Sequence, residues 1–245
     1  MKIILLAAGL GSRLKPLTDN CPKSLLHILD NKSVIERTID MINSCCQCEI
    51  VVVTGYKRHK LNDVLLKYSN CTLVNNPFYR VTNSIASLWF AKDHLSDDVI
   101  IFNADVIISD KLLKVILETK TKAAVFYDSS IGMEADYKVA EQNGKVIVMS
   151  DELKDFSGEY VGVTKLNKES ALQLKNKVES MIDDELYCEW YETALVEMIF
   201  EKEFLLEAVD VANHEWTEID NINDLIKAKE IITKLKILKK IKNKD

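Results

Sequence analysis

The chain has 245 residues, of which 47% are hydrophobic and 29% are charged, a composition typical of a folded globular protein. Its net charge of −6 excludes nucleic-acid binding driven by overall charge, so an anionic ligand would have to meet local cations. No apolar run approaches the ~20 residues of a membrane span, and we expect a cytoplasmic protein without one. The six cysteines lack the spacing of a disulfide framework or a zinc site, which predicts free thiols.

The first 120 residues alternate between short apolar runs and amphipathic segments. The run that begins at Lys2 leads directly into a turn, so it predicts a first strand rather than a signal peptide. Ser33 and Glu36 have the spacing of a capping box at a helix start. This alternation predicts a doubly wound, Rossmann-like α/β fold with a mixed, mainly parallel sheet and helices on both faces. Further strands are expected over 49–55, 71–76 and 98–105, and helices over 33–43, 59–69 and 84–95.

The character of the sequence changes near residue 121. The dipeptide Asn143-Gly144 is a strong β-hairpin signal. We therefore expect a single domain over 1–245 whose second half, about 121–230, adds antiparallel strands over the carboxyl edge of the sheet. The lysine-rich segment 231–245 predicts a solvated helix end rather than a membrane contact, because lysine is favoured at that end of a helix. Strands are expected over 122–128, 136–150, 158–166 and near 205–211, and helices over 167–181 and 189–201.

The segment "LLAAGLGSRLKPLTDNCPKSLL", residues 5–26, leaves the first strand through a glycine-containing turn. In open α/β sheets such a turn is where ligands bind. Leu14 stands where a dinucleotide fingerprint needs its third glycine, and the chain has no G-x-x-x-x-G-K-[ST] loop. Gly9 and Gly11 instead allow the backbone to approach a base and phosphates, and Arg13 offers a planar donor fork. Pro16 and Pro22 stiffen the return to Lys23. The alternative is a plain strand–helix turn with surface cations.

This segment resembles the signature of the sugar-nucleotidyltransferase-like superfamily, L-A-A-G-x-G-x-R-x-x-P-x-T-x-x-x-P-K. The segments "NNPFYRVTNSIASLWFA" and "EWTEIDNINDLIKA" are similar to the phosphocholine and phosphonate cytidylyltransferase branch of that superfamily. The resemblance extends to about residue 230. Every fixed position of the signature is matched, by Leu6, Ala7, Ala8, Gly9, Gly11, Arg13, Pro16, Thr18, Pro22 and Lys23.

The resemblance implies an Mg²⁺-dependent cytidylyltransferase that transfers CMP from CTP to a small phosphorylated or phosphonylated amine such as phosphocholine, for use in surface glycan or capsule decoration. Residues 1–120 would bind the nucleotide and 121–230 the acceptor. Lys23 and Arg13 would be catalytic, and Asp105 and Asp220 would bind the metal. Asp105 is followed by Val106, so it is the only carboxylate at that strand end. The implied nucleotide contacts are Leu6, Ala7, Ala8, Gly9, Gly11, Asn83, Ser84, Ser87 and Asp105.

The expected acceptor site combines aromatic and acidic side chains, a chemistry that suits a cationic amine. Aminoethylphosphonate and an amino-acid-derived phosphate such as phosphoglutamine stay open as acceptors. A sugar-1-phosphate nucleotidyltransferase is the alternative enzyme, and a non-catalytic nucleotide-binding regulator the alternative class. The assembly state is also open, with a homodimer as one option, and no nucleic-acid partner is expected. The acceptor candidates are Tyr137, Glu159, Glu189, Trp190, Tyr191, Glu192 and Trp216.

Overall fold

The computed structural model describes residues 1–133, 135–201 and 204–242, with side chains as far as Ile237. The strands are β1 Lys2–Ala7, β2 Glu49–Thr54, β3 Cys71–Asn75, β4 Val99–Asn103, β5 Val106–Ile108, β6 Ala123–Asp128, β7 Lys138–Gln142, β8 Lys145–Ser150, β9 Gly158–Leu166, β10 Glu207–Asp210 and β11 Trp216–Glu218. The helices are α1 Val34–Cys45, α2 Arg58–Leu65, α3 Ser84–Phe90, α4 Asp110–Glu118, α5 Lys168–Asp183, α6 Tyr191–Phe200 and α7 Ile222–Lys242.

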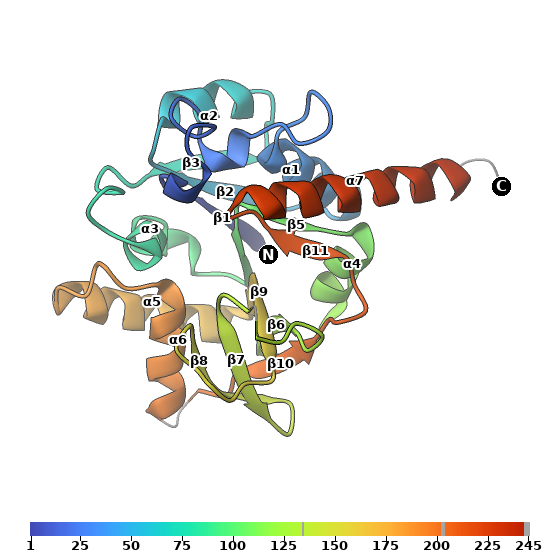
Figure 1. The fold of residues 1–245 in the computed structure, drawn as a ribbon. Coiled ribbons are helices and arrows are strands. Elements are labelled where there is room, and N and C mark those ends of the chain that lie inside the picture. Colours follow the sequence, from blue (N-terminus) through green and yellow to red (C-terminus); the bar gives the residue numbers. More distant parts are fainter. Residues whose placement is uncertain (134, 202–203, 243–245) are drawn as a thin grey trace.

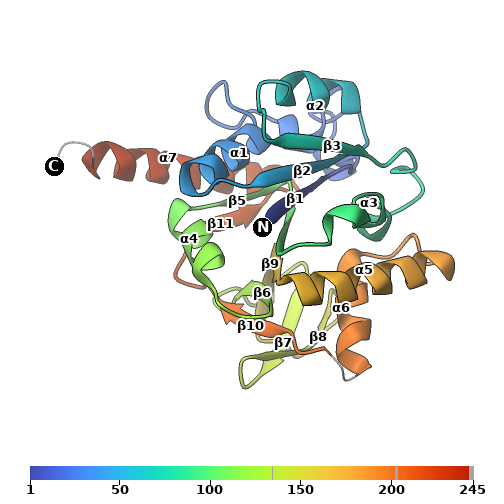
Figure 2. The ribbon, with the colours of Figure 1, turned by 180° about the vertical axis from the view of Figure 1, so that it is seen from behind.

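A nine-stranded sheet in the order β3-β2-β1-β4-β9-β6-β10-β8-β7 forms the centre of the molecule (Figures 1 and 2). Strands β1 to β4 are parallel to one another, whereas β9 runs antiparallel to both β4 and β6. The predicted Rossmann-like α/β fold with a mixed sheet is therefore confirmed, and its first four strands are wholly parallel. The antiparallel strands β7, β8 and β9 continue the same sheet, rather than lying over its carboxyl edge as the sequence predicted.

Helices cover both faces of the sheet because the strands are apolar on both sides. Ile4 belongs to the hydrophobic cluster that α3, α5 and α6 help to form, whereas Ile3 and Leu5 belong to the cluster on the other face with α1, α2 and α4. Side chains of successive strand residues point to opposite faces, so one continuous apolar run supplies both clusters. This explains why the strands lack an alternating polar pattern.

The short strands β5 and β11 pair with each other in a separate antiparallel sheet. Neither strand was predicted, and α4 was not predicted either. Helix α7 covers this pair through Ile231 and Ile232, which join Ile107, Ile219 and Leu14 in a third hydrophobic cluster. Beyond this contact α7 extends past the rest of the molecule (Figure 1). Of the predicted helix end 231–245, residues 243–245 lie outside the described residues.

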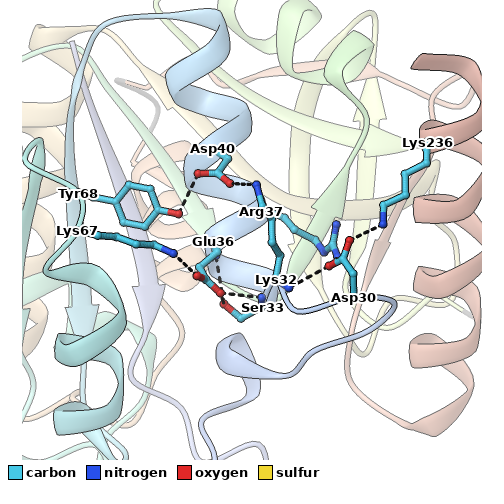
Figure 3. Close-up of polar contacts among 9 residues, drawn as sticks. All are labelled: Asp30, Lys32, Ser33, Glu36, Arg37, Asp40, Lys67, Tyr68 and Lys236. Carbon is cyan, nitrogen blue, oxygen red and sulfur yellow. Dashed lines mark hydrogen bonds and ion pairs between the residues drawn. The ribbon is translucent and has the colours of Figure 1, made fainter. Parts of the chain in front are cut away.

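Polar contacts fix the beginning of α1 (Figure 3). Ser33 and Glu36 form the predicted capping box, in which the Ser33 backbone N–H donates to Glu36 Oε2 at 2.8 Å. Glu36 also pairs with Lys67, beyond the end of α2, and Asp30 pairs with Lys236 on α7. The first turn of α1 is therefore tied to the turn after α2, and the loop before α1 is tied to α7.

The predicted hairpin is confirmed between β7 and β8, where Asn143 and Gly144 both have positive φ angles, of 55° and 75°. All six cysteines are free. Within the described ranges, no helix is both long and apolar enough to cross a membrane.

Candidate active site

The loop after β1 is packed so tightly at Gly11 that no other residue would fit without strain. Gly11 has a φ of 62° and accepts a hydrogen bond on its carbonyl from Thr18 Oγ1 at 2.7 Å. A Cβ atom at this position would lie 3.1 Å from both Lys23 Cβ and Thr18 Cγ2, and positive φ is costly for residues with a Cβ. The tight packing brings the backbone of the first half of the loop against Lys23.

Lys23 forms the electrostatic centre of the site. Its Nζ lies 2.5 Å from Asp105 Oδ2 and 2.8 Å from Asp220 Oδ1. Arg13 approaches the same Asp220 oxygen at 2.7 Å, with most of its own side chain exposed. Burial by itself would lower the pKa of Lys23, but the Asp105 and Asp220 carboxylates outweigh it and raise that pKa above its ordinary value. The two aspartates and two cations predicted from sequence are therefore brought together.

A third carboxylate, Glu218, completes this group. One oxygen each of Asp105, Glu218 and Asp220 lie within 4.8 Å of one another. The antiparallel pairing of Val106 with Glu218 explains the arrangement, because it places Asp105, just before β5, opposite the end of β11. Burial, followed by the nearby charges of Asp105 and Asp220, raises the pKa of Glu218 well above its ordinary value.

These carboxylates have the chemistry of a site for a hard divalent cation. Mg²⁺ prefers oxygen ligands and commonly takes only one or two carboxylates from the protein. Asp105 Oδ1 is buried and has no hydrogen-bond partner among the described residues, which leaves an oxygen atom available as a ligand. Asp105, Glu218 and Asp220 could therefore hold Mg²⁺.

The carboxylates open into one pocket of about 610 Å³. It lies where the loops after β1 and β4 meet, the place where ligands bind in doubly wound sheets. Ala7 is 7% exposed and does not line this pocket. The other predicted catalytic and nucleotide-binding residues do, namely Leu6, Ala8, Gly9, Gly11, Arg13, Lys23, Asn83, Ser84, Ser87 and Asp105.

The polar side chains near α3 are held in place by hydrogen bonds. Asn83 caps the helix by accepting from the Ser84 backbone N–H at 2.8 Å. Ser84 Oγ accepts from the Tyr191 backbone N–H at 2.9 Å, and Ser87 Oγ accepts from Asn76 Nδ2 at 3.1 Å. These bonds fix one wall of the pocket before any ligand binds.

Another part of the pocket lining is aromatic and acidic. Tyr137 contacts Trp190 edge to face, with ring centroids 5.0 Å apart, and lies 6.1 Å from the ring of Tyr160. Glu192 lines the pocket beside them, although it is only 6% exposed. Burial raises the pKa of the Glu192 carboxyl to about 8. Three of the predicted acceptor residues, Tyr137, Trp190 and Glu192, therefore meet in this pocket.

The other two aromatic acceptor candidates do not line the pocket. Tyr191 is fully buried, and its hydroxyl lies 2.6 Å from that of Tyr160 and 3.1 Å from Thr164 Oγ1. Trp216 is 5% exposed and donates from Nε1 to Asp128 Oδ2 at 2.7 Å. Both rings are part of the protein interior, where large aromatic side chains are commonly found.

The two remaining acidic candidates also lie outside the pocket lining. Glu159 accepts from the Asp136 backbone N–H at 3.1 Å, and burial raises its pKa to about 7. Glu189 accepts from Thr193 Oγ1 at 3.4 Å. Glu159 therefore supports a neighbouring residue of the pocket, because Asp136 itself is part of the lining.

The sequence interpretation missed several lining residues. Glu218 had a recognisable signal, because it precedes Asp220 by two positions and so shares a face with it in extended chain. Asp136 and Asp151 could not be identified in the same way, because they lie in connections around the β7–β8 hairpin. The lining residues that were not predicted are Ser12, Tyr79, Thr82, Asn103, Asp136, Asp151, Tyr160 and Glu218.

Known proteins resemble this chain over nearly its whole length. The family model for nucleotidyl transferases matches residues 2–234. The chain is 28% identical to the CTP:phosphoglutamine cytidylyltransferase of Campylobacter jejuni, over 92% of this chain and 98% of that protein. It is 42% identical to the choline-phosphate cytidylyltransferase of Haemophilus influenzae, over 44% of this chain and 46% of that protein. The solved structure of the CTP:phosphocholine cytidylyltransferase of Streptococcus pneumoniae has the same fold, with a TM-score of 0.77, 23% identity, and coverage of 94% of this chain and 98% of that one.

Proposed function

Because the chain belongs to the nucleotidyl transferase family, we propose that it transfers CMP from CTP to a small phosphorylated or phosphonylated amine and releases pyrophosphate. One observation carries this proposal. A single pocket is lined by the signature loop, by the carboxylates Asp105, Glu218 and Asp220, and by an aromatic wall that contains Glu192. A triphosphate and a cationic acceptor therefore have complementary surfaces in the same cavity.

In the proposed reaction, an oxygen of the acceptor phosphate forms a bond to the α-phosphorus of CTP. The bond from that phosphorus to the oxygen bridging to the β-phosphate breaks, and pyrophosphate leaves with the electron pair. A phosphate dianion is already a nucleophile, so no residue has to remove a proton. Lys23 and Arg13 contribute by neutralising negative charge around the phosphates, an effect that is strong in a site of low dielectric.

We propose Mg²⁺ as the cofactor, held by Asp105, Glu218 and Asp220. When bound, the ion supplies positive charge that neutralises the triphosphate. Lys23 already contacts two of these carboxylates, so it lies close to where the phosphates would have to be.

Cytidine as the base is supported by the relatives, two of which are named as cytidylyltransferases at 28% and 42% identity. Ala8, Gly9, Asn83 and Ser87 all line the pocket. Backbone groups and amide side chains can pair with the edge of a base, and we propose these four residues as base contacts.

The acceptor is proposed to carry a cationic amine. The rings of Tyr137, Tyr160 and Trp190 can attract a cation through their faces, and Glu192 can supply a counter-charge. Phosphocholine, aminoethylphosphonate and phosphoglutamine each combine an amine or amide with a phosphoryl group. A sugar 1-phosphate fits this wall less well, because a sugar needs several hydrogen-bonding side chains where the aromatic rings stand.

The test is a matrix of the four nucleoside triphosphates against phosphocholine, phosphoethanolamine, aminoethylphosphonate, phosphoglutamine and glucose 1-phosphate, with pyrophosphate release as the measurement. We expect turnover with CTP and at least one of the four amine or amide acceptors, and none with Lys23→Ala. Turnover confined to glucose 1-phosphate would assign the alternative enzyme. No turnover with any pair would refute the proposed activity.

A further inference from the structure

We infer that Asp128 is a positioning residue that holds two elements in a fixed relation to each other. One is β11, which ends at Glu218 and precedes Asp220, and the other is the acceptor loop. The acceptor loop is defined here as the described residues 129–133 and 135–137 between β6 and β7, which include Asp136 and Tyr137 of the pocket. The part of this inference that concerns the acceptor rests on the proposed acceptor. The part that concerns Mn²⁺ binding rests on the proposed metal site of Asp105, Glu218 and Asp220.

Asp128 uses both oxygens of its carboxylate, and each oxygen binds a different element. Oδ2 accepts from Trp216 Nε1 at 2.7 Å, at the start of β11. Oδ1 accepts from the backbone N–H of Ser130 at 2.9 Å and from its hydroxyl at 2.5 Å, at the start of the acceptor loop. Asp128 is only 5% exposed, and hydrogen bonds to a carboxylate in such a place are stronger than bonds between neutral groups.

The bond to Trp216 matters because β11 is only three residues long. Its described pairing is with β5, through Trp216, Thr217 and Glu218. Glu218 and Asp220 follow on this segment, and Asp105 directly precedes β5. The Trp216–Asp128 bond thus ties the two-stranded sheet, which carries Glu218 and is flanked by Asp105 and Asp220, to the end of β6 in the main sheet.

The backbone of Asp128 is itself fixed. Asp128 pairs with Glu159 on β9, and a Cβ atom added to Gly158 would lie 2.3 Å from the Asp128 carbonyl oxygen. Only glycine, which has no Cβ atom, can pack this closely, so the backbone of β9 at Gly158 lies directly against the backbone of Asp128. The far end of the acceptor loop is held by the same strand, since Glu159 accepts from the Asp136 backbone N–H.

These contacts form a continuous connection between β11 and the acceptor loop. Glu218 ends β11 and Asp220 follows it, while Tyr137 of the aromatic wall ends the acceptor loop. Asp128 binds both through one rigid side chain. Residues that orient metal ligands commonly change metal affinity about 10- to 100-fold when they are removed, so a comparable effect is expected here.

The decisive variants are Trp216→Phe and Asp128→Asn. The first removes the indole N–H and leaves a smaller phenyl ring in the same place, so it should loosen β11 and weaken Mn²⁺ binding about tenfold. The affinity is measured from the electron paramagnetic resonance signal of free Mn²⁺. The second keeps an acceptor for Trp216 but presents an amide N–H₂ to the Ser130 N–H. It should raise the KM for the acceptor about tenfold and leave the KM for CTP within about threefold.

Ser129→Ala is the matched control, because Ser129 Oγ donates to Asp210 Oδ2 at 2.6 Å and therefore anchors the same loop to β10 instead of β11. We expect wild-type Mn²⁺ affinity in this variant. Wild-type Mn²⁺ affinity in Trp216→Phe, or an equal loss in Ser129→Ala, would overturn the inference. If Trp216→Phe fails to fold, Asp128→Asn becomes the deciding variant. A KM for the acceptor equal to that of wild type in Asp128→Asn would then overturn the inference. If wild-type protein turns over no phosphorylated amine, the proposed function fails while the Mn²⁺ titration still tests Asp128.

Discussion

The buried carboxyl of Glu192 should make acceptor binding depend on pH. Burial raises its pKa from 4.5 to about 8, so in the empty pocket about nine in ten Glu192 side chains are neutral at pH 7. A cationic acceptor favours the charged form, and each binding event at neutral pH must therefore release a proton from Glu192. The KM for the acceptor should fall about tenfold per pH unit as the pH rises towards 8, and level off above it.

The assay is the acceptor kcat/KM from pH 6 to 9 for wild type and Glu192→Gln. The wild-type profile should rise about 50-fold over the range from pH 6 to 8, whereas the variant should lack this rise and be less active at pH 8. Ionisation of the acceptor phosphate occurs near pH 6 and affects both proteins equally, so the difference between them isolates Glu192. Superimposable profiles of the two proteins would refute the role of Glu192 as the counter-charge.

The same shift has a consequence for stability. Because the folded protein binds the Glu192 proton more tightly than the unfolded chain does, stability should decline as the pH rises from 4.5 to about 8. Glu192→Gln does not carry this proton. Its free energy of unfolding, relative to that of the wild type, should therefore increase over the same pH range in urea titrations. An equal difference in free energy of unfolding between the two proteins at pH 5 and at pH 8 would show that the pKa of Glu192 is not raised in the folded protein.

Four further substitutions test the remaining parts of the site and fold. Lys23→Ala and Asp105→Asn should each abolish pyrophosphate release while circular dichroism shows an intact fold, and near-wild-type rates in either would remove the proposed mechanism. Gly11→Ala should raise the KM for CTP at least about tenfold, because a Cβ atom at a φ of 62° would lie 3.1 Å from side-chain atoms of Lys23 and Thr18. A KM for CTP equal to that of wild type would show that the loop tolerates the strain. Lys165→Met should lower the free energy of unfolding by about 3 kcal/mol without changing kcat. The reason is that Lys165 Nζ donates to the carbonyls of Ile116, Leu117 and Thr119 at 2.7 to 2.9 Å. A loss under about 0.5 kcal/mol would mean that water replaces the ammonium group as the donor to these carbonyls.

The parts of the site that could be predicted from sequence depend on local spacing. The signature loop holds Gly11, Arg13 and Lys23 within 13 positions, and a turn after a buried strand can lie only at the carboxyl edge of the sheet. Asp105 follows directly from the same reasoning, because it lies in the turn directly after the fourth parallel strand. Asp220 was found through resemblance, and the structure brings it to Lys23 at 2.8 Å.

The parts that could not be predicted depend on contacts between distant segments. Strands β5 and β11 are three residues each, too short to show a period, and they pair across about a hundred positions of sequence. The spacing of Glu218 from Asp220 is the only local signal for its place in the site, and its position opposite Asp105 depends on that pairing. Tyr191 and Trp216 were assigned to the acceptor site from their residue type, but an aromatic ring serves equally well in a core, and only the fold distinguishes the two.

The ammonium group of Lys23 affects how the protein can be handled. Since it lies between Asp105 and Asp220, their mutual repulsion is already offset when no divalent ion is present. Structural zinc domains behave differently, because they unfold when the metal is withdrawn. Extensive dialysis against EDTA should accordingly yield native protein, ready for reconstitution with any chosen cation, and a melting temperature that collapses under such treatment would mean that Lys23 is an inadequate substitute for the ion.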